Sequence, residues 1–244
     1  MKPFKFPLAD FTPALIIFDK DGTLIDFHAM WGGWLTDLGQ RLDAAAGVAI
    51  TDPLCKAMDF DAANGRIAPH GQLALTPMAE LRALTSAVLL TVGLSPSAAE
   101  ATLKKVWQPP DPVVLAQPVT DLTDLFTALH THGLKVAIAT SDDRLPTETW
   151  LAEMGLASLL DGLVCADDGL PLKPASDMVH HLCRALDIPP YQTVMVGDNV
   201  VDLQMGRAAG VGLTIGVLSG LGSAEDLEPY ADVLLASVAA LLKK

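Results

Sequence analysis

The fold is decided by the stretch Phe18-Asp19-Lys20-Asp21-Gly22-Thr23-Leu24, whose first residue is the last of the apolar run Ala14–Phe18. A short apolar run that ends abruptly in polar residues and glycine is typical of a buried parallel strand leading into a loop. A turn that Gly22 makes possible can direct the carboxylates of Asp19 and Asp21 into one crevice. We interpret Asp19 as a nucleophile and Asp21 as an acid/base group; the alternative is an ordinary polar turn.

Similar apolar runs recur in the second half of the chain and alternate with helical patterns. The runs that we interpret as strands cover Leu134–Ala139, Gly162–Cys165, Thr193–Val196, Val211–Val217 and Asp232–Leu235. The segments that we interpret as helices cover Asp121–Thr131, Leu145–Met154, Ala175–Leu186 and Asn199–Ala209, the third with Pro174 in its first turn. This alternation predicts an α/β fold with a doubly wound, open parallel sheet, that is, a Rossmann-like core.

The stretch from about residue 27 to residue 117 interrupts this alternation. Apolar residues recur there at helical steps, in Trp31, Trp34, Leu35, Leu38 and Leu42, and the segments Met78–Val92 and Ser97–Trp107 also have helical patterns. The proline-rich segment Pro109–Pro118 cannot form a regular helix and is predicted to be a return linker. We therefore expect a core of residues 1–26 and 118–244 and an all-helical insert, with its linker, of residues 27–117.

Three further motifs follow predicted strands, at the edge where open α/β sheets bind ligands. Thr140 and Ser141 can hold phosphate oxygens through a hydroxyl and backbone N–H groups, although a helix cap is the more ordinary role. Lys173 can provide a point charge for phosphate, although a lysine taken alone is usually a surface residue. Asp198 and Asp202 stand one helical turn apart, which also suits an N-cap with a neighbour that complements the helix dipole.

Together these motifs resemble the signature of the haloacid dehalogenase-like superfamily of phosphohydrolases. That signature runs D-x-D-x-T, then a strand-end Ser or Thr, then Lys, then G-D-x-x-x-D. The matching positions are Asp19, Asp21, Thr23, Thr140, Lys173, Asp198 and Asp202. In this family, a long gap between the first two motifs corresponds to a helical cap of the C1 type. The chain is most similar in this respect to the phosphoglycolate phosphatase-like branch.

The resemblance implies an aspartyl-phosphate mechanism with Mg²⁺ as cofactor. Asp19 would attack phosphorus, while Asp21 would protonate the leaving oxygen and then deprotonate the hydrolytic water. The carboxylates of Asp19 and Asp198 and the backbone carbonyl of Asp21 would hold the metal, because hard cations prefer oxygen ligands. Such a cation would let an anionic nucleophile approach an anionic phosphate.

The remaining matched residues would support this chemistry. By resemblance, Lys173 would be a catalytic residue that offsets the charge of Asp19 and of the phosphoryl group. Thr140 and Ser141, with Lys173, would bind the phosphate oxygens. Thr23 would shape the first loop, and Asp202 would orient Lys173 or a metal-bound water from a second layer around the site.

The insert and one departure from the family pattern bear on substrate choice. We expect His28, Trp31, Arg66 and His70 to be candidates for contacts with the leaving group, although Trp31 suits the cap core and the last two suit the surface. Lys20 stands between the two aspartates, where the family commonly has an apolar residue. A lysine there also occurs in the DKTGT motif of ion pumps, which lack the second aspartate.

Composition further restricts the classes of molecule that the chain is expected to bind. The formal net charge is −13, so nucleic acid and anionic membranes are poor partners. The cysteines are three in number and widely spaced, which argues against a disulfide framework and favours a reducing, cytoplasmic location. The expected partner is a small phosphate ester, bound by a monomer or homodimer. A phosphomutase of the same fold and a non-catalytic binding protein remain the alternatives.

Overall fold

The computed structural model describes residues 11–68, 71–76 and 78–242 and divides into two compact units. The first, here called the sheet unit, comprises the chain up to Asp26 and from Gln117 onward; the second, the insert unit, is Phe27–Ala116. The expected boundary put Gln117 in the insert. Its carbonyl instead accepts a hydrogen bond from Asp26 N at 2.8 Å, and Ile25 forms a β-bridge with Pro118, which ties this residue to the sheet unit.

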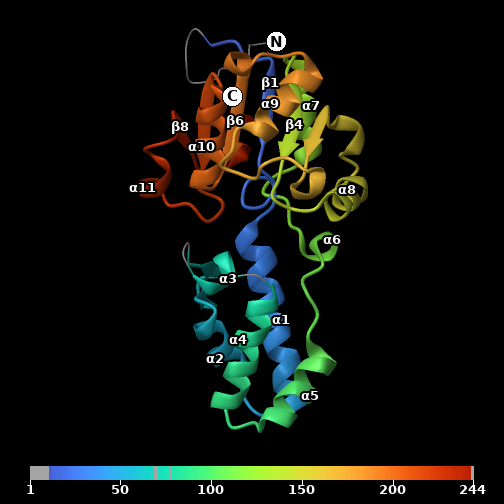
Figure 1. The fold of residues 1–244 in the computed structure, drawn as a ribbon, viewed down its shortest axis with the longest axis vertical. Coiled ribbons are helices and arrows are strands. Elements are labelled where there is room, and N and C mark those ends of the chain that lie inside the picture. The colour runs from blue at the N-terminus through green and yellow to red at the C-terminus, as the bar shows by residue number, and fades with distance from the viewer. Residues whose placement is uncertain (1–10, 69–70, 77, 243–244) are drawn as a thin grey trace. The chain divides into compact units, whose positions relative to one another are not determined.

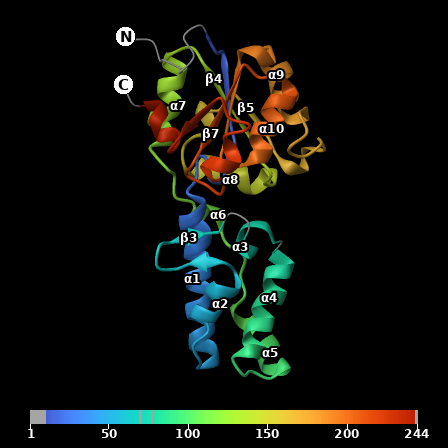
Figure 2. The same cartoon turned by 90° about the vertical axis from the view of Figure 1, so that its left-hand side faces the viewer.

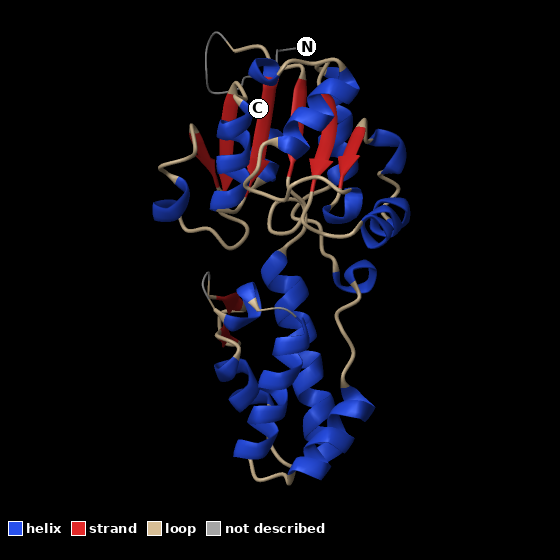
Figure 3. Ribbon diagram, in the orientation of Figure 1, coloured by secondary structure: helices blue, strands red, loops and turns tan. Residues whose placement is uncertain are grey.

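A parallel sheet organises the sheet unit, in the order β5-β4-β1-β6-β7-β8 (Figures 1 and 3). Its strands are β1 (Leu15–Phe18), β4 (Lys135–Ala139), β5 (Gly162–Val164), β6 (Thr193–Gly197), β7 (Leu213–Val217) and β8 (Val233–Leu235). In the register, Ile17 lies opposite Ala137 on one side and Met195 on the other. The α/β class and the parallel sheet expected from the apolar runs are therefore confirmed, with strand ends shifted by a residue or two.

Helices cover both faces of this sheet, which explains why its central strands are mostly apolar. They are α7 (Leu122–Thr131), α8 (Arg144–Glu153), α9 (Asp177–Leu186) and α10 (Val200–Ala209). Figure 2 shows α7 on one side of the sheet and α9 and α10 on the other. Ile17 belongs to the core beneath α9 and α10, whereas the ring of Phe18, the next residue, stacks on Phe126 of α7 with centroids 6.0 Å apart. The side chains of successive residues of β1 therefore pack on opposite faces of the sheet.

Several short elements complete the sheet unit, and one predicted helix start is wrong. The short elements are η1 (Ala157–Leu159), η2 (Ala166–Asp168), η3 (Pro190–Gln192), α11 (Ala224–Leu227) and η4 (Val238–Leu242). Pro174 does not lie in the first turn of α9, which begins at Asp177. The chain turns before the helix, where Ala175 N donates to Leu172 O at 3.0 Å.

The insert unit is mostly helical rather than all-helical. Its helices are α1 (Phe27–Ala46), α2 (Thr51–Ala57), α3 (Gln72–Leu75), α4 (Met78–Thr91), α5 (Pro96–Val106) and α6 (Pro112–Leu115). A small antiparallel ladder joins β2 (Phe60–Asp61) to β3 (Arg66–Ile67). Its turn forms because the Asp61 carboxylate accepts hydrogen bonds from Ala63 N and Asn64 N, at 3.0 and 3.2 Å.

The proline-rich segment also contains a helix that the sequence analysis did not expect. Asp111 accepts a hydrogen bond from Val114 N through its carboxylate at 3.3 Å and another from Leu115 N through its carbonyl at 3.0 Å. Pro112 therefore occupies the first helical position, where the missing N–H of proline costs nothing. This single turn, α6, interrupts the predicted linker.

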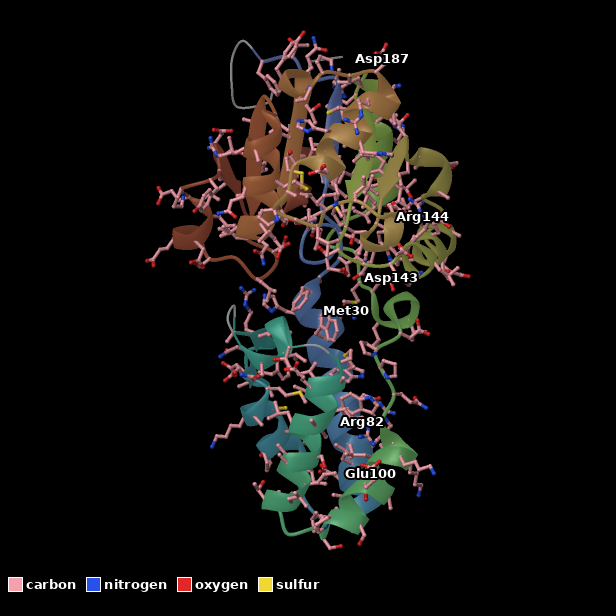
Figure 4. The ribbon with its side chains drawn as sticks, viewed as in Figure 1. Met30, Arg82, Glu100, Asp143, Arg144 and Asp187 are labelled. Carbon is pink, nitrogen blue, oxygen red and sulfur yellow. The ribbon has the colours of Figure 1, made fainter. Side chains whose placement is uncertain are left out.

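Aromatic packing and one ion pair hold the long helices of the insert unit together. Trp34 of α1 is buried, contacts the rings of Trp31 and Trp107 edge-on, and donates through Nε1 to Gln108 O at 2.9 Å. Arg82 of α4 and Glu100 of α5 pair at 2.7 Å (Figure 4). Within the described parts of both units, no helix has the length and apolarity to cross a membrane.

Candidate active site

The predicted site residues gather at the carboxyl edge of the sheet, around the end of β1. This strand lies between β4 and β6. The sheet continues from β4 to β5 on one side of β1, and from β6 to β7 and β8 on the other side. Such a point, where the strand order reverses, is where open α/β sheets form their ligand crevice. Asp19 is the first residue after β1, and its N–H donates to Val196 O of β6 at 2.9 Å.

A buried lysine joins two of the predicted carboxylates. Lys173 Nζ lies 2.5 Å from Asp19 Oδ1 and 2.7 Å from Asp202 Oδ1. All three side chains are at least nine-tenths buried. Burial alone would lower the pKa of Lys173, but Asp19 and Asp202 more than offset it and raise that pKa, so the ammonium stays charged. The surface-lysine interpretation of this residue is therefore excluded.

Asp198 and Asp202 are both buried at the start of α10, in different roles. Asn199 is the N-cap, and its N–H donates to Asp202 Oδ2 at 3.0 Å, so Asp202 belongs to a capping box as well as to the lysine pair. Asp198 Oδ1 accepts from Thr23 Oγ1 at 3.3 Å, and Oδ2 accepts from Leu221 N at 2.8 Å. These bonds hold the Asp198 carboxylate beside the turn that follows β1.

The carboxylates of Asp19, Asp198 and Asp202 form a cluster that fits a hard divalent cation. One oxygen from each lies within 4.8 Å of the others. Burial is the main cause that raises the pKa of Asp19, to about 6, and that of Asp198 well above its ordinary value. Three buried carboxylates beside one lysine leave an excess of negative charge, and oxygen donors are what Mg²⁺ prefers. The donor set therefore suits the expected cation.

Asp21, the second aspartate of the motif, belongs to a separate ionic group. Its Oδ1 lies 2.8 Å from Lys20 Nζ, which also lies 2.9 Å from Asp142 Oδ2. Burial raises the pKa of Asp21 to about 7, against the lowering effect of Lys20. A carboxyl group that titrates near neutrality can both give and take a proton at physiological pH.

Thr140 and Ser141 follow β4 directly. Thr140 is buried, its N–H donates to Val164 O at 3.0 Å, and its Oγ1 accepts from Asp142 N at 3.1 Å, whereas Ser141 is exposed. The N-cap of α8 is Asp143, so neither residue takes the capping position that the alternative interpretation required. Thr140 is thereby linked to the Asp21 group, because Asp142 contacts Lys20.

Residues of the loop after β7 also belong to the site, and the sequence analysis missed them. Ser219 Oγ donates to Gly22 O at 2.8 Å, and Leu221 N donates to Asp198 as described above. Gly22 has φ +87°, and a Cβ there would collide with the Asp198 carboxylate, so glycine is required on both counts. The available signal was the run Ser219-Gly220-Leu221-Gly222-Ser223, a glycine- and serine-rich loop directly after a predicted strand.

The residues proposed for leaving-group contacts lie in the insert unit or outside the described residues. His28 is buried, and its Nδ1 accepts a hydrogen bond from Ile67 N at 3.1 Å, which gives it a structural role in that unit. Trp31 is half-buried and contacts Phe27 and Trp34, whereas Arg66 is exposed on β3. His70 lies outside the described residues.

Comparisons with known proteins identify related sequences. A family model described as haloacid dehalogenase-like hydrolase matches residues 13–210. The plasmid phosphoglycolate phosphatase of Cupriavidus necator is 33% identical over 116 residues, which are 48% of this chain and 50% of that protein. This chain thus spans about half the length of that relative. The phosphoglycolate phosphatase of Rhodospirillum rubrum is 26% identical over 213 residues, covering 83% of this chain and 79% of that enzyme.

The fold has counterparts among solved structures. A candidate β-phosphoglucomutase from Thermotoga maritima superposes with a TM-score of 0.67, covering 94% of this chain and 96% of that one at 17% identity. At this identity the likeness concerns the fold alone.

Proposed function

The chain belongs to the haloacid dehalogenase-like hydrolases, and on that premise we propose that it hydrolyses small phosphate monoesters with Asp19 as the nucleophile. The observation that carries this proposal is the contact of Lys173 with both Asp19 and Asp202, beside Asp198, at the reversal point of the sheet. An ammonium group there can balance a carboxylate nucleophile and an incoming phosphoryl group.

In the proposed reaction, Asp19 and Asp21 have complementary roles. An Asp19 carboxylate oxygen bonds to phosphorus as the bond from phosphorus to the ester oxygen breaks, and the Asp21 carboxyl gives its proton to that leaving oxygen. Asp21 then takes a proton from water as the water oxygen attacks phosphorus. Inorganic phosphate leaves, and the Asp19 carboxylate is restored. The pKa of about 7 for Asp21 supports this double role.

Other residues bind and orient the reacting groups. Thr140 and Ser141, with Lys173, would hold the phosphate oxygens, and Thr23 and Asp202 would keep Asp198 and Lys173 in position. Mg²⁺ would be held by Asp19 and Asp198 and by the backbone carbonyl of Asp21, where it would neutralise charge on the transferring phosphoryl group. The buried carboxylate cluster supports Asp19 and Asp198 as two of these ligands.

The proposed substrates are small phosphorylated metabolites of the phosphoglycolate or sugar phosphate type. Both relatives described above carry the name phosphoglycolate phosphatase, which supports a short phosphorylated acid as the first compound to test.

A metal-dependent substrate panel tests this function. Release of inorganic phosphate is measured from 2-phosphoglycolate, glucose 6-phosphate, glycerol 3-phosphate, a nucleotide monophosphate and p-nitrophenyl phosphate, each with Mg²⁺ and with EDTA. We expect metal-dependent hydrolysis of at least one ester. An isomeric sugar phosphate formed without free phosphate would instead identify a mutase, and the absence of turnover across the panel would favour a binding role.

A further inference from the structure

Lys20 is the one residue of the DxD motif that the proposed reaction does not use. Its side chain is only 2% exposed, yet its ammonium group lies within 2.9 Å of two carboxylates, those of Asp21 and Asp142. The ring of buried Trp150 lies below it, with the centroid 5.8 Å from Nζ. Burying a lysine destabilises the folded state unless its charge is paired, so the presence of a lysine at this buried position requires an explanation.

The contacts of the Lys20 ammonium group argue against a direct role in binding substrate. Its three donor hydrogens face two carboxylates and an aromatic ring, whose negative face attracts a cation. Any influence of Lys20 on a bound ester must therefore pass through Asp21 or Asp142.

Lys20 also links two loops that the proposed reaction needs together. Asp21 lies in the turn after β1, and Asp142 lies in the loop after β4, where its N–H donates to Thr140 Oγ1 and its carbonyl accepts from Ala166 N at 2.9 Å. The loop that carries Asp142 is therefore held in place by its own backbone bonds. From this anchored residue, Lys20 reaches across to the Asp21 side chain and restrains it.

We propose that Lys20 is a positioning residue, which holds the Asp21 carboxyl against the Thr140–Asp142 loop so that it faces the leaving oxygen of the ester. This inference rests on the proposed function. Lys20 and Lys173 then have parallel roles: Lys173 pairs with the nucleophile Asp19, and Lys20 pairs with the acid/base residue Asp21. Each lysine lies between a reacting carboxylate and a second carboxylate that holds the lysine itself.

The signature of this role is a selective loss that depends on the leaving group. An alkoxide leaves only with a proton from Asp21, whereas p-nitrophenolate is stable enough to leave without one. Misplacing Asp21 should therefore slow alkyl esters far more than p-nitrophenyl phosphate. A merely structural role for Lys20 would slow both equally.

The test compares Lys20→Met with Lys135→Met, using p-nitrophenyl phosphate and whichever alkyl ester of the panel the wild type hydrolyses fastest. Lys135 is an exposed lysine at the opposite, amino-terminal end of β4, with Nζ 3.4 Å from Leu186 O, so its loss should leave both rates unchanged. For Lys20→Met, we expect kcat/KM on the alkyl ester to fall at least about tenfold more than kcat/KM on p-nitrophenyl phosphate. The comparison uses kcat/KM because it reports the step in which the ester oxygen leaves, whereas hydrolysis of the aspartyl-phosphate is common to both esters.

A second variant keeps the test decisive if Lys20→Met does not fold. Asp142→Asn leaves Lys20 in place but removes one of its two carboxylates, so it should show the same bias against the alkyl ester to a smaller degree. An equal loss of kcat/KM on both esters overturns the inference in either variant. A wild type that hydrolyses neither ester defeats the proposed function, whereas an active wild type with an unbiased Lys20→Met defeats the inference alone.

Discussion

The ammonium group of Lys173 lies 2.5 Å from Oδ1 of Asp19, although 154 residues separate the two in the chain. The same ammonium group also contacts Asp202, so one positive charge lies between the proposed nucleophile and a helix-capping carboxylate. This relationship makes the nucleophile, its counter-charge and the start of α10 one ionic unit.

Replacing the nucleophile should remove the chemistry and keep the fold. Asp19→Asn retains the shape of the side chain but not its nucleophilic oxygen, so phosphate release should fall by about 10³-fold or more. A steady-state assay checks the rate, and hydroxylamine trapping of an acyl phosphate should succeed only with the wild type. The matched control is Asp124→Asn, an exposed aspartate in the first turn of α7. Near-wild-type turnover by Asp19→Asn would reject the assignment.

Loss of Lys173 should affect both rate and stability, unlike loss of the nucleophile. Lys173→Met leaves Asp19 and Asp202 buried without their shared cation, which typically costs about 3–5 kcal/mol of unfolding free energy. The transferring phosphoryl group loses its counter-charge too, so kcat should fall about 10²-fold or more. Lys173→Arg should not restore activity, because a planar guanidinium cannot replace a compact ammonium between these two oxygens. Denaturant unfolding and kcat measured on the same preparations check both effects; an Arg variant with full activity would contradict the geometric argument.

The metal-free protein should lose stability as the pH rises from about 4 to 7. Burial raises the pKa of Asp19 to about 6 and that of Asp21 to about 7, both above the value of 3.8 for an exposed aspartate. The folded state therefore binds more protons than the unfolded state in this window, and unfolding free energy falls with rising pH.

Mg²⁺ should reverse this trend at neutral pH. Because the cation binds only the ionised cluster of the folded state, the melting temperature at pH 7 should rise with Mg²⁺ and be unchanged by Mg²⁺ at pH 4. Thermal melts in EDTA and in Mg²⁺ across this range provide the measurement. A metal-free protein that becomes more stable from pH 4 to 7 would show that ionisation of these buried carboxylates does not destabilise the folded state.

The hydroxyl of Thr23 should increase the affinity for Mg²⁺ although Thr23 is not one of the proposed ligands. Thr23→Val removes the donor to Asp198 Oδ1 while keeping the side-chain volume, so the Mg²⁺ concentration for half-maximal activity should rise about tenfold or more. The rate at saturating Mg²⁺ should change much less. Thr85→Val is the matched control, because Thr85 is an equally buried threonine whose hydroxyl donates to Leu81 O within α4. An unchanged Mg²⁺ requirement in Thr23→Val would exclude this role.

Much of the fold and of the site could be predicted from local sequence, because the governing physics is local. The apolar run before Asp19 has to be buried, and the abrupt change to polar residues and Gly22 marks where the strand ends. The same reasoning, applied to Thr140, Asp198 and the apolar runs before them, gives the parallel sheet and the edge where the motifs meet.

Only the tertiary structure decided how those residues pair, since the partners lie far apart in the chain. Lys20 looked like a departure from a family pattern, and its place between Asp21 and Asp142 depends on β1 and β4 being neighbours in the sheet. Ser219 and Leu221 carry no catalytic group, so their bonds to Gly22 and Asp198 arise only because β7 lies beside β6. Residue types and strand ends follow from short-range burial and turn chemistry, whereas ionic partners and carboxylate orientation follow from which strands the folded sheet brings together.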